Sequence, residues 1–232
     1  ATADMKHEYE DLYLQLLYWI SLETGLTYLD GKEMKVSDKA DKFFSLASHV
    51  RVQELFEAWL RNKGINEYEF SSKVQLKGKP APGLNDIPDS QRLKTARRMM
   101  TESLSLLDEK HKWFSVRDFA AFSRTRTPDM IVKSISEDDA LNMNLTYRGI
   151  YTGKSSDLHD GIPRASNWHV VEGEFVAKAI WMLAVLGVVY ISKDLEWFSL
   201  TPEGRYCLGL TDEPQTESEA EECLVVQPNF EI

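Results

Sequence analysis

The sequence has little cysteine: among 232 residues only Cys207 and Cys223 are cysteines, and no C-x-x-C spacing occurs. Two cysteines are too few for a disulfide framework, so a reducing compartment is the simpler interpretation, and we expect both to be buried or incidental. No apolar run approaches the roughly 20 residues of a membrane span, and no stretch resembles a signal peptide. We therefore expect a soluble, cytoplasmic protein without membrane contact.

Motifs for phosphate and metal binding are also scarce. The nearest approach to a phosphate-binding loop is residues 152–155, but Arg148 stands where that motif requires its first glycine. No histidine lies at metal-ligand spacing from another histidine or a cysteine. The closest arrangement, His159 beside Asp157 and Asp160, is better interpreted as a solvated loop. We predict no cofactor-binding and no metal-binding residue.

Groups for acid–base or nucleophilic catalysis are not paired either. Glu172 and Glu174 are two residues apart, so they diverge on a helix and do not suggest a general acid and base. Ser115 precedes a predicted helix and lacks the glycines of a nucleophile elbow, so we interpret it as a helix cap. We predict no catalytic residue and do not expect an enzyme.

Charge is abundant but unevenly spread. The formal net charge is −10, which argues against a protein that coats nucleic acid without specificity. Lys and Arg number 6 against 11 Asp and Glu in residues 1–60, 15 against 9 in residues 61–133, and 6 against 17 in residues 134–232. A basic middle segment thus lies between two acidic flanks.

Apolar spacing predicts a series of helices separated by turn-rich stretches. Helices are expected at about residues 9–22, 40–46, 51–61, 91–107, 116–123 and 168–186, with a further short helix from Pro202. Strands are expected at residues 26–29 and 34–36 around Asp30-Gly31, at 147–151, and at 186–191 and 197–200. The helix at 168–186 is apolar around much of its circumference and should form a core.

The two halves of the chain repeat one pattern, which bears on the fold. An apolar helix ends at Gly25 or at Gly187, and a two-stranded segment and a short amphipathic stretch follow, with the second turn two residues longer. A core helix that feeds a β-ribbon through a glycine is typical of the C-terminal half of a winged-helix domain. We predict a mainly α (α+β) fold of tandem winged-helix-like units, each with a small antiparallel hairpin; another α+β helix-and-hairpin packing is the alternative.

Composition suggests the following organisation. We predict a winged-helix-like unit at 1–70, a linker at 71–90, a second unit at 91–210 with an insertion at about 134–167, an acidic linker at 211–222, and at 223–232 the first strand of a further domain. The chain is accordingly expected to belong to a larger protein.

Several segments resemble a known family of bacterial and archaeal proteins, in which winged-helix repeats precede a portion similar to the N-terminal domain of XPB-type helicases. The resemblance covers most of the chain loosely and is carried by residues 55–60 (LFEAWL), 168–175 (WHVVEGEF), 186–189 (LGVV), 198–204 (FSLTPEG) and 225–232 (VVQPNFEI). It implies a helicase-associated module in a DNA-associated system, such as genome maintenance or defence against foreign DNA. It supplies no catalytic residue.

Two functions follow as hypotheses. The first is contact with double-stranded DNA through phosphate-binding side chains of the basic middle segment. The candidates are Lys73, Lys77, Lys79, Arg92, Lys94, Arg97, Arg98, Arg117, Arg124, Arg126 and Lys133, with residues 124–127 the sharpest cluster. The alternative is a protein-interaction scaffold that binds a partner protein or further domains of the same chain; Trp181 could then face a partner, although burial in its own fold is the simpler expectation.

Overall fold

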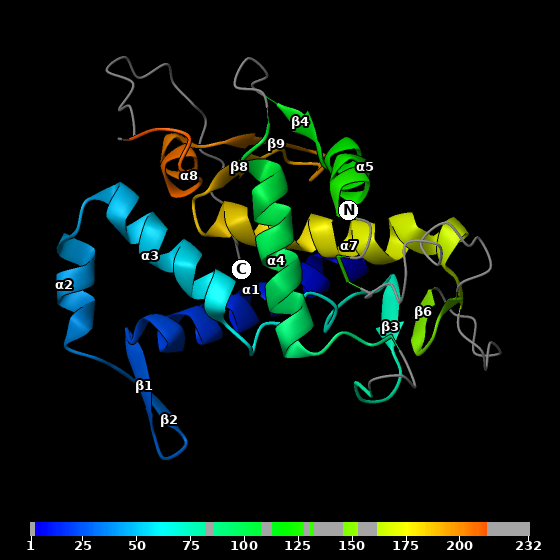
Figure 1. Cartoon of the computed structure of the whole chain (residues 1–232). Coiled ribbons are helices and arrows are strands. Elements are labelled where there is room, and N and C mark those ends of the chain that lie inside the picture. Colours follow the sequence, from blue (N-terminus) through cyan, green and yellow to red (C-terminus); the bar gives the residue numbers. More distant parts are fainter. Residues whose placement is uncertain are drawn as a thin grey trace.

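The computed structural model describes residues 3–81, 86–107, 113–127, 130–131, 146–152 and 162–212. The helices are α1 (Ala3–Thr24), α2 (Lys39–Ser45), α3 (Ser48–Arg61), α4 (Ser90–Leu104), α5 (Val116–Arg126), α7 (Arg164–Val185) and α8 (Pro202–Cys207) (Figure 1). The strands are β1 (Thr27–Asp30), β2 (Glu33–Val36), β3 (Val74–Leu76), β4 (Phe114–Ser115), β5 (Thr146–Tyr147), β6 (Ile150–Thr152), β7 (Ile162–Pro163), β8 (Val189–Ile191) and β9 (Trp197–Leu200). The described chain is mainly helical with small antiparallel sheets, which confirms the α+β class.

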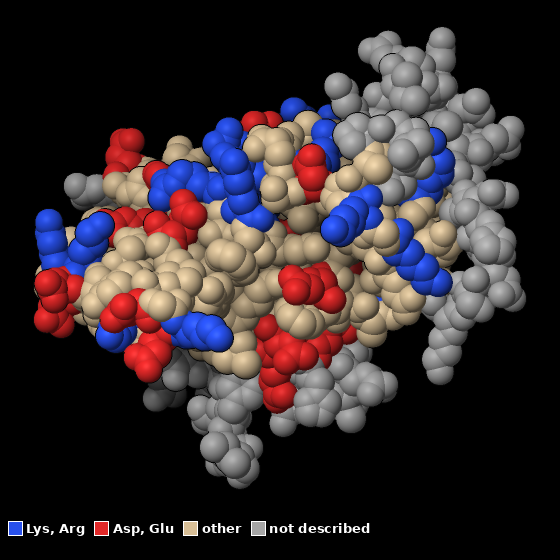
Figure 2. All heavy atoms as spheres, turned by 90° about the horizontal axis from the view of Figure 1, so that it is seen from below, with Lys and Arg blue, Asp and Glu red and all other residues tan. Residues whose placement is uncertain are grey.

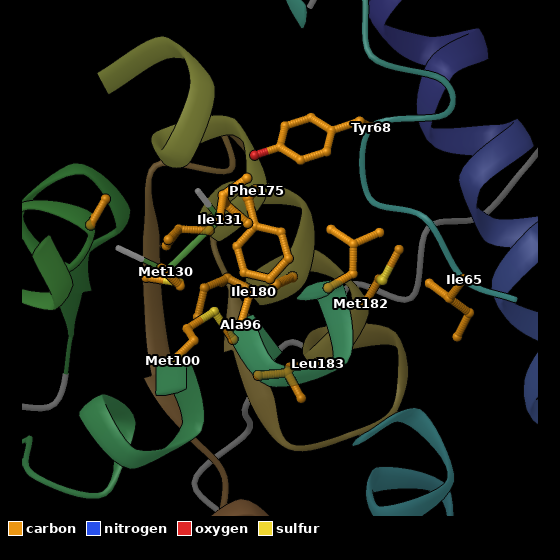
Figure 3. Close-up of a cluster of buried hydrophobic side chains, with 14 of the residues drawn as sticks. Ile65, Tyr68, Ala96, Met100, Met130, Ile131, Phe175, Ile180, Met182 and Leu183 are labelled. Carbon is orange, nitrogen blue, oxygen red and sulfur yellow. The ribbon is translucent and has the colours of Figure 1, made fainter. Parts of the chain in front are cut away.

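Helix α7 runs through the middle of the molecule, and α4 crosses it in Figure 1. Its side chains Phe175, Ile180 and Leu183 are fully buried. Figure 3 shows them gathered with Met100 of α4 in one apolar cluster. The apolar residues around most of the circumference of this helix therefore have neighbours on most sides, and the prediction of a core helix at 168–186 is confirmed.

Residues from both halves of the chain share one hydrophobic core. The indole Nε1 of Trp59 in α3 donates to the sulfur of Met182 in α7 at 3.4 Å. The hydroxyl of Tyr68 donates to the carbonyl of Val171, also in α7, at 2.8 Å. The boundary drawn at residues 71–90 stays a prediction, but the two halves are packed together across it.

The segment predicted as a linker contains a strand. Val74–Leu76 (β3) pairs antiparallel with Ile150–Thr152 (β6), and Val74 is buried. The strand predicted at 147–151 is in fact two short strands, β5 and β6, which are separated by a turn at 148–149. A pairing of this kind joins residues far apart in sequence, so neither composition nor local periodicity indicates it.

The internal repeat is present in the geometry. Gly25 follows α1 with φ of 71° and Gly187 follows α7 with φ of 84°, a conformation that favours glycine. The hydroxyl of Ser37 donates to the carbonyl of Gly25 at 2.6 Å, and the hydroxyl of Thr201 donates to that of Gly187 at 2.7 Å. Each of these bonds joins the end of a hairpin to the glycine that precedes it, which lies 12 residues earlier in the first case and 14 in the second. The spacing from glycine to hydroxyl thus differs by two residues, whereas the turns themselves are residues 31–32 and 192–196.

The order of elements differs between the halves. The second has α4, β4, α5, the short strands β5, β6 and β7, and then α7 before the hairpin β8–β9. Strand β4 pairs with β9, so the sheet order is β4-β9-β8. In the first half only α1 precedes the hairpin β1–β2, and α2 and α3 come after it. The predicted strand at 223–232 and nearly all of the predicted acidic linker at 211–222 lie outside the described residues.

Candidate interaction surfaces

Three aromatic side chains lie exposed on the sheet β4-β9-β8. Trp113 directly precedes β4, Tyr190 is on β8 and Trp197 is on β9, and each is 44–48% exposed. Tyr190 lies opposite Ser199, and Trp197 lies opposite Ser115. Since residues two apart on a strand share a face, the register places these side chains on the same side of the sheet. We call Trp113, Tyr190 and Trp197 the aromatic face.

The opposite side of this sheet is anchored in the core. Phe198 is fully buried, and its ring centroid lies 5.7 Å from that of Phe114 and 5.4 Å from that of Phe119. The backbone N–H of Val116 donates to the carbonyl of Glu196 at 2.8 Å, which joins α5 to the sheet. Packing of the inner residues fixes the orientation of the strands, so the alternate residues are held outward.

The turn between β8 and β9 is tied by its own side chains. The carboxylate of Asp194 accepts bonds from the hydroxyl of Ser192 and from the backbone N–H of Glu196, and these bonds lower the pKa of Asp194. Lys193 is the only basic residue in the turn, which also carries two carboxylates. A turn that bound phosphate groups would be expected to carry an excess of Lys or Arg.

Arg97, a candidate for DNA contact, is fully buried in α4. Its guanidinium binds both carboxylate oxygens of Glu67, at 2.6 and 3.2 Å. It also donates to the carbonyls of Trp59, Asn62 and Ile65 at 2.7–3.1 Å. These five bonds use all five N–H groups of the side chain. The prediction that Arg97 contacts phosphate is wrong, because it has no donor and no surface left to offer.

Two further candidates are held by neighbouring segments. The ammonium of Lys73 lies 3.2 Å from the carboxylate of Glu174, although Lys73 itself is exposed. The Nε of Arg92 donates to the carbonyl of Ile131 at 2.9 Å. Both side chains join segments far apart in sequence, so each has a structural role in addition to any contact with a ligand.

The other described candidates lie on the stretch after β3, on α4 and on α5. On the face in Figure 2, atoms of Lys and Arg are interspersed with those of Asp and Glu. The half-buried or exposed candidates are Lys77, whose ammonium lies over the ring of Tyr151 at 4.7 Å, and Lys79, Lys94, Arg98, Arg117, Arg124 and Arg126. Lys133 lies outside the described residues.

Helix α5 presents the sharpest basic group that the sequence predicted. Arg117, Arg124 and Arg126 are all exposed on it. The guanidinium of Arg124 lies over the ring of Trp168 at 4.7 Å, an arrangement that restricts its motion and leaves it accessible. These three side chains are available for phosphate contact, and DNA binding through them stays a prediction.

Helix α7 itself is covered by other elements. Among its described side chains only His169 is exposed. Tyr9 and Tyr13 of α1 pack their rings on Trp181, with centroids 5.1 and 6.5 Å away. Trp181 is therefore covered by its own chain, as the simpler expectation had it. The described part of α7 therefore offers little exposed surface with which to enter a DNA groove.

A buried ionic cluster, which was not predicted from the sequence, links α1 to α7. The ammonium of Lys178 pairs with the carboxylate of Glu8, lies 4.0 Å from that of Glu174, and sits over the ring of Tyr9 at 3.8 Å. Glu8, Lys178 and Glu174 are all buried. Because each charge has an opposite partner, the cluster fixes how the two helices sit against each other.

The cluster shifts the pKa values of its members. Burial alone would raise the pKa of Glu8, but hydrogen bonds from Lys178 and Ser72, with the charge of Lys178, outweigh burial and lower it. Burial lowers the pKa of Lys178, and the neighbouring carboxylates of Glu8 and Glu174 offset only part of that effect. The charged form of Glu8 is thus favoured by folding.

The lowered pKa of Glu8 predicts an acid dependence of stability. A carboxyl whose folded pKa lies below its ordinary 4.5 stabilises the fold above that pH, and this contribution is lost as pH falls through the folded value. Glu8→Gln is expected to lower the free energy of unfolding by about 2 kcal/mol at neutral pH. Urea unfolding at several pH values should show the gap to the wild type closing below pH 4.5.

Asp11→Asn, at an exposed position on the same helix, is the matched control. Its free energy of unfolding should depend on pH as that of the wild type does. A gap for Glu8→Gln that stays constant from neutral to acid pH would contradict the role of the Glu8 charge.

A cleft of about 470 Å³ lies between α3, α4 and α8. Apolar atoms of Phe56 and Leu208 line it, together with Arg98 and Glu102 from α4. Cys207 also borders it, and burial raises the pKa of this thiol to about 12, so it is protonated at neutral pH. The thiol is therefore a poor nucleophile, in keeping with the expectation that it is incidental.

Comparison with known proteins gives no relative: no family model, no curated protein and no solved structure matches this chain. Within the described residues no three His, Cys, Asp or Glu side chains are grouped as metal ligands would be. No described helix is long and apolar enough to cross a membrane.

Proposed function

We propose that this chain is a non-catalytic protein-interaction module built on one winged-helix unit, formed by α4, β4, α5, α7 and the hairpin β8–β9. The order helix, strand, helix, helix, hairpin, with the strands β5–β7 inserted between the second and third of these helices, supports this. The pairing of β4 with the second strand of the hairpin supports it too. Residues 1–70 do not follow that order. We therefore propose a single winged-helix unit with α1, the hairpin β1–β2, α2 and α3 packed beside it, in place of two tandem units.

The aromatic face is the observation that carries the proposal of protein binding. Tyr and Trp are enriched at the centres of protein interfaces, where they bury large areas with few rotatable bonds. Trp113, Tyr190 and Trp197 offer three such side chains on one rigid sheet, each about half exposed. Burying these apolar surfaces against a partner protein would be favourable, because they are left exposed to water in the chain alone.

The usual DNA-binding mode of a winged helix finds less support. In that mode the third helix enters the major groove and the wing contacts the backbone. Here the third helix is α7, which is covered, and the turn of the wing carries more acidic than basic side chains. The net charge of −10 further disfavours binding to a polyanion.

DNA contact by α5 is the second candidate, because Arg117, Arg124 and Arg126 are exposed on one short helix. In either case the resemblance to helicase-associated proteins suggests the setting. We propose that the module positions a protein partner, or DNA, for a catalytic component elsewhere in the same polypeptide or complex.

A crosslinking experiment tests the choice. A photoreactive amino acid at position 199, at the centre of the aromatic face, should capture a protein partner in the host cell. Binding of that purified partner should weaken at least about tenfold when Trp113 and Trp197 are both changed to Ala, because such side chains dominate interface energies. Phe44→Ala, which removes an exposed aromatic ring on α2, is the matched control and should bind as the wild type.

Duplex DNA binding, measured by fluorescence anisotropy at several salt concentrations, distinguishes the second candidate. Protein binding predicts at most weak duplex affinity and little change in the variant with Arg124 and Arg126 both changed to Ala. Tight, salt-dependent duplex binding that this variant loses, together with no partner sensitive to the tryptophan changes, would overturn the proposal in favour of DNA.

A further inference from the structure

The hairpin β1–β2 projects from the body of the molecule at the lower left of Figure 1. It is amphipathic, although its apolar face does not pack on the core. Alternation puts Leu29, Met34 and Val36 on one face, where they are 50, 42 and 73% exposed. The other face carries Tyr28, Asp30, Glu33 and Lys35. A strand pair of this kind is marginal alone in water and gains stability from further strands.

The backbone pattern shows which groups of β2 point away from β1. The N–H of Ser37 donates to the carbonyl of Leu26 at 2.9 Å. Hydrogen-bonded and non-hydrogen-bonded pairs alternate along an antiparallel ladder, so the pair of Thr27 with Val36 and that of Leu29 with Met34 are non-hydrogen-bonded. The N–H and C=O groups of Met34 and Val36 therefore point to the outer edge of β2.

That edge belongs to a two-stranded sheet, so no further described strand occupies it. Two copies of β2 related by a two-fold axis can pair only in registers that place residues with outward-pointing N–H and C=O groups opposite each other. These conditions leave three registers: Met34 opposite its own copy, Met34 opposite Val36, or Val36 opposite its own copy.

Charge selects one of the three. With Met34 on the axis, Glu33 of each copy lies opposite Lys35 of the other, which makes two ion pairs. With Met34 opposite Val36, Lys35 lies opposite its own copy and like charges repel. With Val36 on the axis, Lys35 lies opposite Ser37 and no ion pair forms. The sequence Glu33-Met34-Lys35 is thus self-complementary in the first register alone.

We propose that β2 is a self-association edge, through which two copies of this chain pair antiparallel about Met34 and form a four-stranded sheet. The two-fold axis runs perpendicular to that sheet, so the apolar faces of both hairpins lie on the same side and Met34 meets its counterpart. The arrangement is closed, because each copy uses the same edge. It goes beyond the proposed function and uses no residue of the aromatic face.

Charge reversal provides a sharp test, because the proposed register gives Glu33 and Lys35 a defined partner in the other copy; within its own hairpin, Lys35 also pairs with Asp30. Sedimentation of the wild type from about 10 µM to about 1 mM should show a dimer with a Kd on the order of 10⁻⁴ M, since the interface is smaller than a standard one. Glu33→Lys or Lys35→Glu alone places like charges opposite each other twice and should weaken the dimer at least about tenfold.

Two rescues should restore pairing. The double variant carrying both Glu33→Lys and Lys35→Glu regains both ion pairs, and an equimolar mixture of the two single variants forms a heterodimer with opposite charges at both positions. Asp41→Lys and Lys42→Glu make similar charge changes at exposed positions on α2 and should leave the wild-type dimer unchanged. Circular dichroism and thermal unfolding verify that each variant is folded.

A wild type that stays monomeric at about 1 mM would overturn the proposal. So would single variants that dimerise as the wild type does, or a failure of either rescue. Changing Trp113 and Trp197 to Ala should leave this dimer intact, so the proposal does not depend on the partner of the aromatic face.

Discussion

Changing Arg97 to Ala is expected to lower the free energy of unfolding by about 3–5 kcal/mol, as measured by urea denaturation. The substitution removes the cation that faces the fully buried carboxylate of Glu67. It also leaves the carbonyls of Trp59, Asn62 and Ile65 without these donors. A buried charge without a partner is far more costly than an exposed one, and domains of this size have only about 5–15 kcal/mol of stability in total.

Arg98→Ala is the matched control, since Arg98 is the next residue of the same helix and is exposed. Its effect should lie within about 0.5 kcal/mol of zero. If the two substitutions were equally mild, Arg97 would not be the link that joins α4 to residues 59–67, and its buried geometry would have to be reconsidered. A loss confined to Arg97 would instead explain why this arginine cannot serve a DNA-binding surface.

The sequence did contain a signal for the burial of Arg97. The buried side chains Leu93, Ala96, Met100 and Leu104 follow helical spacing, and position 97 is four residues after Leu93 and three before Met100. An arginine at that position lies on the apolar stripe. The prediction of a phosphate contact treated charge as proof of exposure, although a buried arginine is stable when a carboxylate and carbonyls meet all its donors.

Local pattern was sufficient where the structure depends on neighbours in sequence. The glycine after each long helix, the short hairpin and the hydroxyl that closes it were all within about 15 residues, and the predicted repeat is present at Gly25 and Gly187. The turn pair Asp30-Gly31 between two short apolar stretches likewise predicted the hairpin β1–β2. It could not show that the apolar face of this hairpin would stay exposed, because that depends on where the rest of the chain packs.

Pairings across long distances in sequence were not predictable. Lys178 lies in the apolar part of α7, and its closest ion-pair partner, Glu8, is on the first helix. The pairing of β3 with β6 joins a stretch that looks like a linker to one that looks like an insertion. The coverage of α7 by α1, which decides against its use as a DNA-reading helix, is a tertiary contact of the same kind.

Changing Gly204 to Ala is expected to lower the free energy of unfolding by about 3 kcal/mol, the upper part of the range for overpacking. A Cβ at this position would overlap the carbonyl oxygen of Val188 and lie 2.8 Å from its carbonyl carbon. It would also approach the hydroxyl of Thr201 to 3.0 Å, and that hydroxyl both caps α8 and closes the hairpin. Val188 directly precedes β8, and its backbone atoms cannot move aside cheaply, so the sheet and α8 must separate.

Gly173→Ala is the informative control because it changes the same atoms in the opposite setting. Gly173 lies within α7, and a Cβ there meets nothing within 4 Å. Alanine favours a helix over glycine, so this variant should gain about 0.5–1 kcal/mol. Opposite signs for the two substitutions, read from thermal unfolding of both proteins, would show that Gly204 is required for space. Equal effects would mean that α8 moves away from the sheet more easily than its packing indicates. The hairpin that carries Tyr190 and Trp197 would then be less rigid than a docking surface requires.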